Sequence, residues 1–116
     1  MAFIIKRNDT RPPYIATMKE KIGEPDESNL DLTDADHVNF IMKAPEALET
    51  KVNSLADIED AATGLVSYTW ETGDTDTSGT YQVEFEIHWA DGGVQTVPNN
   101  SYGEVKIIDD LDGDGE

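Results

Sequence analysis

Three aspartates near the C-terminal end of the chain have the spacing of calcium ligands. Asp110, Asp112 and Asp114 alternate with other residues and Gly115 follows, as at positions 1, 3, 5 and 6 of an EF-hand loop. Such a loop also needs a bidentate glutamate at position 12, and the sequence ends at Glu116. Calcium would be held weakly here or only with help from a neighbour. We therefore expect no metal site, and we interpret residues 109–116 as an acidic, solvated tail.

The two histidines are the other side chains suited to metal binding or proton transfer. His37 lies at the start of an expected strand, and His88 alternates with core residues in another strand. The chain has no cysteine, so a zinc site would need carboxylates brought to a histidine by folding. We expect two separate surface histidines.

No spacing in the sequence is typical of a catalytic centre. The serines lack the strand–turn–helix context of a nucleophile elbow, and no glycine-rich phosphate loop is present. Many carboxylates are available, but the spacing selects no catalytic pair among them. We predict no catalytic, cofactor-binding or metal-binding residues, and a protein that is not an enzyme.

The charge of the chain argues against several classes of partner. The chain has 25 acidic and eight basic residues, a net charge of −17 and a pI near 4.1. This field repels nucleic acids and anionic membranes, so we expect neither as a partner. At about 1 M salt the Debye length falls to about 3 Å, which largely removes the self-repulsion. Because the acids are spread along the chain, we interpret the protein as halophilic rather than as an ordinary acidic domain.

The length of the chain, 116 residues, suits one domain with one hydrophobic core. No apolar run is long enough to cross a bilayer, and Met1–Arg7 lacks the apolar length and cleavage pattern of a signal peptide. The absence of cysteine excludes a disulfide framework. We expect a domain over residues 1–108, followed by the acidic tail.

The clearest element in the sequence is a strand from Tyr81 to Trp89. Its apolar residues alternate with polar ones, so we expect one buried face and one solvent-exposed face. Asp91–Gly93 predicts a tight hairpin turn, because glycine accepts positive φ. Residues 94–97 are then expected to pair back.

Shorter strands are expected along the rest of the chain, at intervals of about ten residues. The expected strands cover residues 3–6, 14–19, 38–43, 51–58, 66–70, 81–89, 94–97 and 102–108. Residues 44–49 are ambiguous between one helical turn and a loop. The pattern favours an all-β sandwich over an α/β fold.

The residues before the long strand indicate the type of sandwich. Residues 76–81 have the pattern Asp-x-Ser-Gly-x-Tyr, which resembles the entry to strand F of immunoglobulin-like domains, where the tyrosine hydroxyl bonds to upstream backbone. Val83 stands where antibody domains have a cysteine. We predict an immunoglobulin-like antiparallel β-sandwich of seven to eight strands, held without a disulfide.

Apolar residues divide between an expected core and an expected contact surface. Five aromatic residues on inward faces are expected in the core rather than on a ligand platform. They are Tyr68, Trp70, Tyr81, Phe85 and Trp89. Ile15, Ile41 and Leu65 lie on outward faces and indicate a surface covered by another segment or another protein. Ala2–Ile5 is apolar on both faces, as in a central strand or in an arm that docks on a neighbour.

Five segments together resemble a known family. In chain order they are Ile5–Pro13, Leu30–Ala35, Val38–Met42, Gly73–Tyr81 and Val97–Tyr102. Over nearly the whole chain they resemble the N-terminal domain of the baseplate upper protein (BppU) family of tailed phages. The resemblance implies a small β-sandwich in the virion tail. In longer relatives this domain attaches peripheral structures, such as receptor-binding proteins, to the tail hub.

From this resemblance we expect a virion structural protein of a tailed virus that infects a halophilic archaeon. Its partners would be other tail or baseplate proteins and further copies of itself, contacted through the N-terminal segment and the strand edges. Assembly in the host cytoplasm agrees with the missing signal peptide. Two alternatives are a capsid decoration protein and a calcium- or carbohydrate-binding module of a cell-surface protein.

Overall fold

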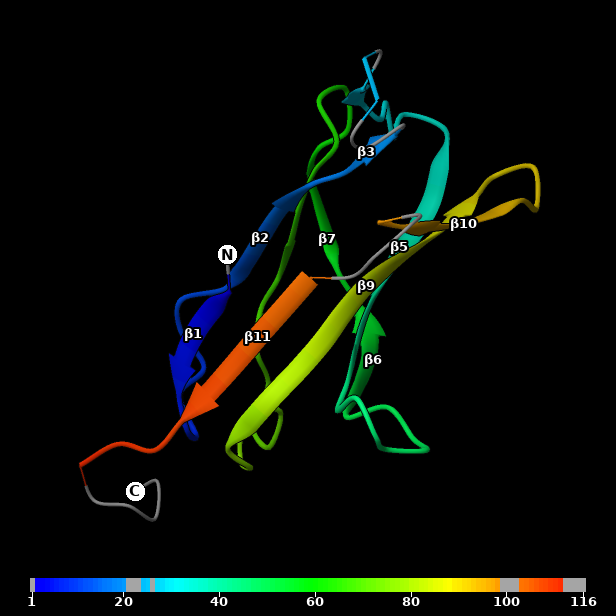
Figure 1. The fold of residues 1–116 in the computed structure, drawn as a ribbon. Helices are drawn as coiled ribbons and strands as arrows, with labels where there is room; N and C mark the ends of the chain where they lie inside the picture. Colours follow the sequence, from blue (N-terminus) through cyan, green and yellow to red (C-terminus); the bar gives the residue numbers. More distant parts are fainter. Residues whose placement is uncertain (1, 21–23, 26, 99–102, 112–116) are drawn as a thin grey trace.

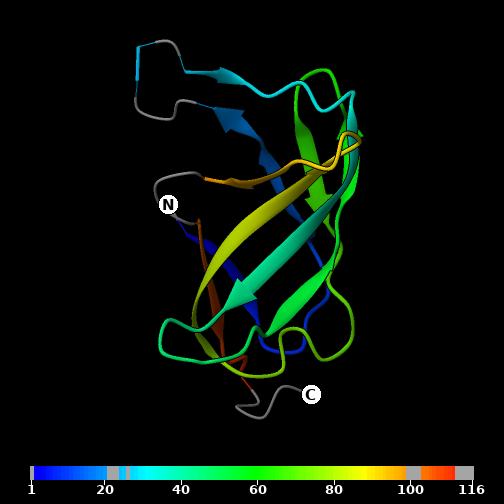
Figure 2. The same cartoon turned by 90° about the vertical axis from the view of Figure 1, so that its right-hand side faces the viewer.

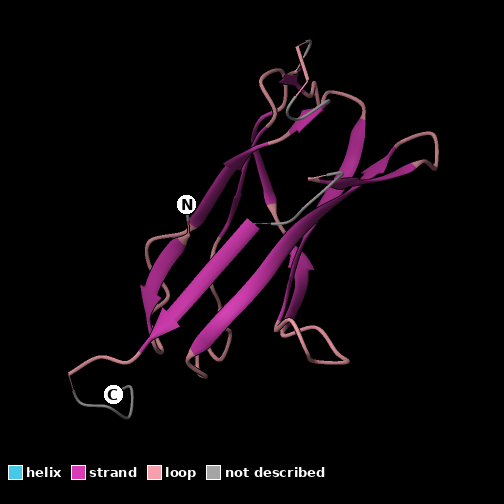
Figure 3. Ribbon diagram, viewed as in Figure 1, coloured by secondary structure: helices cyan, strands magenta, loops and turns pink. Residues whose placement is uncertain are grey.

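All regular elements in the described part of the chain are β-strands, as Figure 3 shows. The computed structural model describes residues 2–20, 24–25, 27–98 and 103–111. This confirms the predicted all-β class. Residues 44–49 form turns and loop rather than a helical turn, with the Ala47 N–H donating to the Ala44 carbonyl oxygen at 3.1 Å.

The described residues form eleven strands, more than the seven to eight expected. They are β1 (Phe3–Lys6), β2 (Tyr14–Thr17), β3 (Lys19–Glu20), β4 (Ser28–Asn29), β5 (Ala35–Lys43), β6 (Val52–Leu55), β7 (Asp57–Asp60), β8 (Leu65–Tyr68), β9 (Gly79–Trp89), β10 (Val94–Val97) and β11 (Gly103–Ile108). The number is higher because the strand expected over residues 51–58 is divided in two and because the short β3 and β4 were not predicted.

Two sheets make up the body of the fold, and they face each other as layers (Figures 1 and 2). The larger sheet has the order β1-β11-β9-β5-β6, and β10 also pairs with β9. The smaller sheet has the order β2-β8-β7, and β3 and β4 form a separate pair. All pairs are antiparallel except β1 with β11, which are parallel. The expectation of a fully antiparallel fold is therefore wrong at this pair, where the rest of the chain supplies the long connection that parallel strands need.

The chain changes from one sheet to the other at both lateral borders of the fold. At one border β1 continues through residues 7–13 into β2, and at the other β6 continues into β7. At the second change the Ala56 N–H donates to the Val38 carbonyl oxygen at 2.8 Å. Residues 3–6 are therefore a terminal strand of the larger sheet, and the alternative of a central strand is wrong.

The core lies between the two sheets and is rich in aromatic rings. Phe40 of β5 stacks on Tyr68 of β8 with ring centroids 4.4 Å apart, which joins the two sheets. Trp70 and Phe85 approach the same Phe40 ring edge-on, at 5.6 and 5.4 Å. The predicted aromatic core is confirmed, although Trp89 is only partly buried and packs against its margin.

The strand β9 and its hairpin turn follow the sequence prediction. The inward residues Tyr81, Val83, Phe85 and Ile87 are buried. Gly92 has a φ of 95°, and the Trp89 N–H donates to the Gly93 carbonyl oxygen at 2.8 Å. The turn directs β10 back along β9, as expected.

Candidate interaction surface

The N-terminal strand β1 is fixed to the core by one face and leaves its other face open. Ile5 is buried, and the Phe3 ring lies 5.3 Å from the Tyr14 ring and 6.0 Å from the Trp70 ring, between centroids. Ile4 points to the outer face and is 58% exposed. Because β-branched residues favour the extended backbone, the run that forms the strand also supplies an exposed aliphatic side chain.

Exposed aliphatic side chains are found mainly on strands at the borders of the two sheets. Those within strands are Ile4, Ile15, Leu55, Val94 and Ile108. Ile4 and Ile108 lie on the paired strands β1 and β11. The expected outward position is confirmed for Ile15, whereas Ile41 and Leu65 are half-buried, because each belongs to a strand with a neighbour on both sides.

Positive charge is concentrated in the N-terminal segment, which forms β1, β2 and the first residue of β3. Residues 1–19 hold four of the eight bases and one of the 25 acids, which gives this segment a net charge of +3. The bases are Lys6, Arg7, Arg11 and Lys19. Arg7 forms an ion pair with Asp109 at 3.6 Å, and Lys19 forms one with Glu27 at 3.7 Å. The acids are thus less evenly spread than we expected, and charge counted along the sequence in short windows would have shown it.

The opposite border carries acidic side chains. In β7, Asp57, Glu59 and Asp60 are all exposed. Glu59 also accepts a hydrogen bond from the Ser67 hydroxyl at 2.6 Å, which holds it on the outer face of the smaller sheet. The two borders therefore differ in charge.

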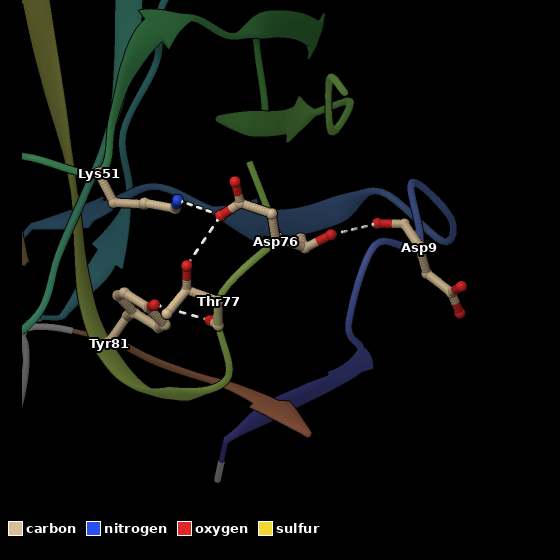
Figure 4. Close-up of polar contacts among 6 residues, drawn as sticks. Asp9, Lys51, Asp76, Thr77 and Tyr81 are labelled. Carbon is tan, nitrogen blue, oxygen red and sulfur yellow. Dashed lines mark hydrogen bonds and ion pairs between the residues drawn. The ribbon is translucent and has the colours of Figure 1, made fainter. Parts of the chain in front are cut away.

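A pair of hydrogen bonds connects the loop 71–78 to its surroundings (Figure 4). The Tyr81 hydroxyl donates to the Thr77 carbonyl oxygen at 2.7 Å, which confirms the predicted tyrosine corner. The Thr75 hydroxyl donates to the Asp9 carbonyl oxygen at 2.7 Å, and Thr75 is buried. The second bond joins this loop to the segment after β1 and so fixes the position of the β1 border.

An ion pair connects Lys51, the residue before β6, to the same network. The Lys51 ammonium pairs with the Asp76 carboxylate, which also accepts a hydrogen bond from the Thr77 hydroxyl at 3.0 Å (Figure 4). The hydrogen bonds from Lys51 and Thr77 both stabilise the charged carboxylate and so lower the pKa of Asp76 below its usual value. The bond from Lys51 makes the larger contribution. Both lateral borders are thereby tied to one loop.

The polar ends of two core aromatic residues also hold loops in place. The Tyr68 hydroxyl donates to the Asp74 carboxylate, and the Trp70 indole N–H donates to the Pro12 carbonyl oxygen at 3.1 Å. Burial of the Tyr68 side chain raises the pKa of its phenol, and the hydrogen bond to Asp74 raises it further by a smaller amount. These groups are used for structure, which leaves them unsuited to serve as a ligand platform.

The two histidines, expected to lie apart, are neighbours. His37 in β5 pairs with His88 in β9, and their rings stack at 4.3 Å between centroids with a 13° angle between planes. The His37 Nδ1 lies 2.8 Å from Asp36 and the His88 Nε2 lies 2.8 Å from Glu86. Among the described residues, no three histidine or acidic side chains are placed to hold one metal ion. The sequence led us to expect both histidines at the surface, but it did not show that β5 and β9 are adjacent.

A cavity of about 200 Å³ opens between β2 and the β10–β11 side of the larger sheet. Met18, Val83, Phe85 and Val97 are among its apolar walls. Its charged lining residues, Lys19 and Glu27, pair with each other. This lining favours apolar packing over acid–base chemistry.

The predicted calcium pattern can be followed only in part. Asp110 is described, whereas Asp112 and Asp114 lie outside the described residues. Across the part of the chain that is described, no helix is long and apolar enough to span a bilayer.

The β1 border is the surface with the strongest physical indication of a partner. It combines a strand edge with no neighbour among the described residues, exposed aliphatic side chains and local positive charge. No protein family model matches this chain and no curated protein is similar to it in sequence, so the partner has to be inferred from this surface.

Proposed function

We propose that this chain is a structural protein of a tailed virion, a tail or baseplate component that works as a scaffold for other subunits. The observation that supports this most directly is the open edge of β1, where the exposed Ile4 lies opposite Lys106 and on the same face as the exposed Ile108 of β11. A bare strand edge with aliphatic side chains is a liability in a free monomer and a suitable contact in an assembly. The five segments that resemble the BppU family support the place in the tail.

An immunoglobulin-like topology is part of this proposal. The adjacent strands β11, β9 and β5 match the order of strands G, F and C in such domains, and β2, β8 and β7 match B, E and D. The hydroxyl of Tyr81, near the start of the F-like strand, makes the bond of a tyrosine corner. Small domains of this type are suited to repeated packing against one another.

Two other functions use parts of the same evidence. A capsid decoration protein would employ the same borders at another place in the particle. A carbohydrate-binding module would need an exposed aromatic platform, and the aromatic rings of the described residues lie in or against the core. The tail scaffold is therefore the function that we favour.

The proposal is tested by mass spectrometry of purified virus particles. We expect the chain to be present in a fixed ratio to the major capsid protein, and to remain with tails when tails are separated from capsids. Recovery with capsids would favour the decoration protein. Absence from particles, while the protein is abundant in infected cells, would rule out both virion functions.

The halophilic interpretation predicts a stability that increases with salt. With a net charge of −17, the folded state is destabilised by self-repulsion, which is screened as the Debye length falls from about 10 Å at 0.1 M to about 3 Å at 1 M. We expect the melting temperature to rise over this range in potassium chloride. A melting temperature that falls with added salt would contradict the interpretation.

A further inference from the structure

The two terminal strands of the larger sheet present similar surfaces at opposite sides of the molecule. In Figure 1, β1 lies at one side and β6 at the other. Among the described residues each strand pairs along one edge only. Each also carries a large exposed aliphatic side chain, Ile4 at 58% exposure and Leu55 at 67%. Together, an open edge and an exposed aliphatic residue favour strand addition.

Ile4 and Leu55 lie on the same face of the sheet. Ile4 is in register with Lys106 of β11, which is in register with Thr80 of β9. Leu55 is in register with Asn39 of β5, which is in register with Glu86 of β9. Residues 80 and 86 are separated by an even number of positions, so their side chains point to the same side of β9. Both aliphatic residues are therefore on the outer face.

The strand directions allow β1 of one copy to extend the sheet of another copy at β6. Following the pairs across the sheet, β1 is parallel to β11, and each of the next three pairs is antiparallel. As a result β1 and β6 run in opposite directions within one molecule. Two copies in the same orientation, placed side by side, would bring β1 against β6 as an antiparallel pair.

The distribution of charge favours this arrangement over two-fold pairing of β1 with itself. Residues 1–19 have a net charge of +3, and Arg7 and Lys19 among their bases are paired with Asp109 and Glu27. Self-pairing of β1 would still place Lys6 of one copy close to Lys6 of the other. The other border continues from β6 into β7, where Asp57 and Glu59 are exposed. Contact between unlike borders therefore places opposite charges close to each other.

We propose that copies of this chain associate head to tail, with β1 of one copy added to β6 of the next. We assign the register that brings the two exposed aliphatic residues, Ile4 and Leu55, opposite each other, which in an antiparallel pair places Lys6 opposite Asn53. In this arrangement the acidic β7 of the next copy lies alongside β2 of the first copy, and the basic residues Arg11 and Lys19 lie on either side of that β2. This deepens the proposed scaffold function by naming the partner as a second copy. Because each copy uses two different surfaces, the contact produces a ring or an open array rather than a closed dimer.

The contact is small and is expected to be weak between isolated molecules. Pairing of two short strands buries less than the roughly 1,200 Å² of a typical stable interface. High salt is needed, since it screens repulsion between copies of net charge −17 while groups in direct contact still interact. The association is therefore suited to a particle in which copies are held close together.

Cysteine cross-linking tests the register, because the chain contains no cysteine of its own. Directly opposed residues in an antiparallel pair have Cβ atoms about 4.5–5.5 Å apart, near the distance that a disulfide bridges. We would mix the Ile4→Cys variant with a size-tagged Leu55→Cys variant at about 1 M salt, under mild oxidation. The mixed dimer should form at least about tenfold faster than with Leu48→Cys, a matched control at a fully exposed loop position.

Several outcomes would overturn the proposal. If Ile4→Cys forms its own homodimer faster than the mixed dimer, β1 pairs with itself. If Leu48→Cys reacts as fast as Leu55→Cys, the cross-links report random collision. Circular dichroism of each variant checks that it is folded, which is expected because the replaced side chains are exposed.

A second measurement avoids engineered cysteines. Sedimentation velocity of the unmodified chain at about 1 M salt should show concentration-dependent association that the Lys6→Glu/Ile4→Lys variant loses. An unchanged profile in this variant would contradict the contact. Presence in virions without cross-linking would leave the proposed function standing and remove only this contact. Cross-linking without presence in virions would support the contact between copies and contradict the proposed virion function.

Discussion

The two ends of the long strand β9 are held by different kinds of contact. Around its start, side-chain bonds join residues 66, 58 and 25 positions apart, namely Thr75 with Asp9, Trp70 with Pro12, and Lys51 with Asp76. Around its end, the side-chain bonds join residues one or two positions apart, namely His37 with Asp36, His88 with Glu86, and Gly93 with Asp91. The long-range side-chain bonds of the described residues are thus found around the start of β9, whereas distant segments are joined at its end by the backbone pairing with β5 and by the stacking of His37 on His88.

This difference indicates where the fold resists change. Bonds between distant residues exist only after large loops of chain have closed, so they contribute to the folded state alone. Bonds between adjacent residues form partly in the unfolded chain as well, and contribute less to the difference in free energy. The loop 71–78 therefore supports the β1 border, whereas the β9–β10 hairpin end can vary with less effect on stability.

The largest expected contrast is between the two tryptophans. Trp70 is buried and bonds to Pro12, whereas Trp89 is only partly buried. Trp70→Ala should lower the free energy of unfolding by about 3–5 kcal/mol, and Trp89→Ala by roughly half of that or less. Urea denaturation at constant high salt measures both, since urea is uncharged. Equal losses of unfolding free energy in the two variants would show that the start and the end of β9 do not differ in this way.

A pair of threonines gives a narrower test of the same contrast. Thr75→Val removes the buried hydroxyl that donates to the Asp9 carbonyl oxygen, and should cost about 1–2 kcal/mol. Thr33→Val, at the exposed hydroxyl that bonds to Asp31, should change stability by less than about 0.5 kcal/mol. Urea midpoints of the two variants give the comparison. A larger loss in the Thr33 variant would reverse our assignment of the rigid end.

The tyrosine corner contributes a single neutral hydrogen bond. Tyr81→Phe removes the donor to the Thr77 carbonyl oxygen and should cost about 1 kcal/mol. Thr77→Ala keeps that backbone acceptor and loses only the side-chain bond to Asp76, so it should cost less. The order of the two thermal melting temperatures tests whether the corner bond matters.

Alkaline pH should weaken the contribution of Tyr68. Its pKa is raised in the folded protein by burial and by Asp74, so the phenol keeps its proton to higher pH when folded than when unfolded. This stabilisation is fully present below the unfolded pKa of about 10 and is lost as the pH rises toward the folded pKa. The stability advantage of the parent over Tyr68→Phe should therefore shrink above about pH 10. A constant difference in urea midpoint from neutral to alkaline pH would disagree with this account.

Local patterns were enough to predict much of the fold. The alternation in residues 81–89 and the glycines of the turn at 91–93 are local signals, and the structure follows them. By contrast, the strand predicted over residues 51–58 changes sheet at Ala56, and the sequence shows no local mark of this change. The change depends on which strands lie on either side, and these are set by contacts distant in the sequence.

The candidate surface was predictable to a similar degree. The exposure of Ile15 followed from its outward position, and the basic N-terminal segment is visible by counting charges. The stacking of His37 on His88 was not predictable, because it depends on the register between β5 and β9. Open strand edges likewise become apparent only when the order of strands in the sheet is known.

The parallel pairing of β1 with β11 has a mechanical consequence. Because the first and last strands run in the same direction, a pull that separates the two termini slides one strand along the other. The hydrogen bonds of the pair are then loaded together in shear, and they do not open one by one as in a peeled hairpin. Forced unfolding is governed by the unfolding rate, so this geometry gives the chain resistance to tension applied through its ends.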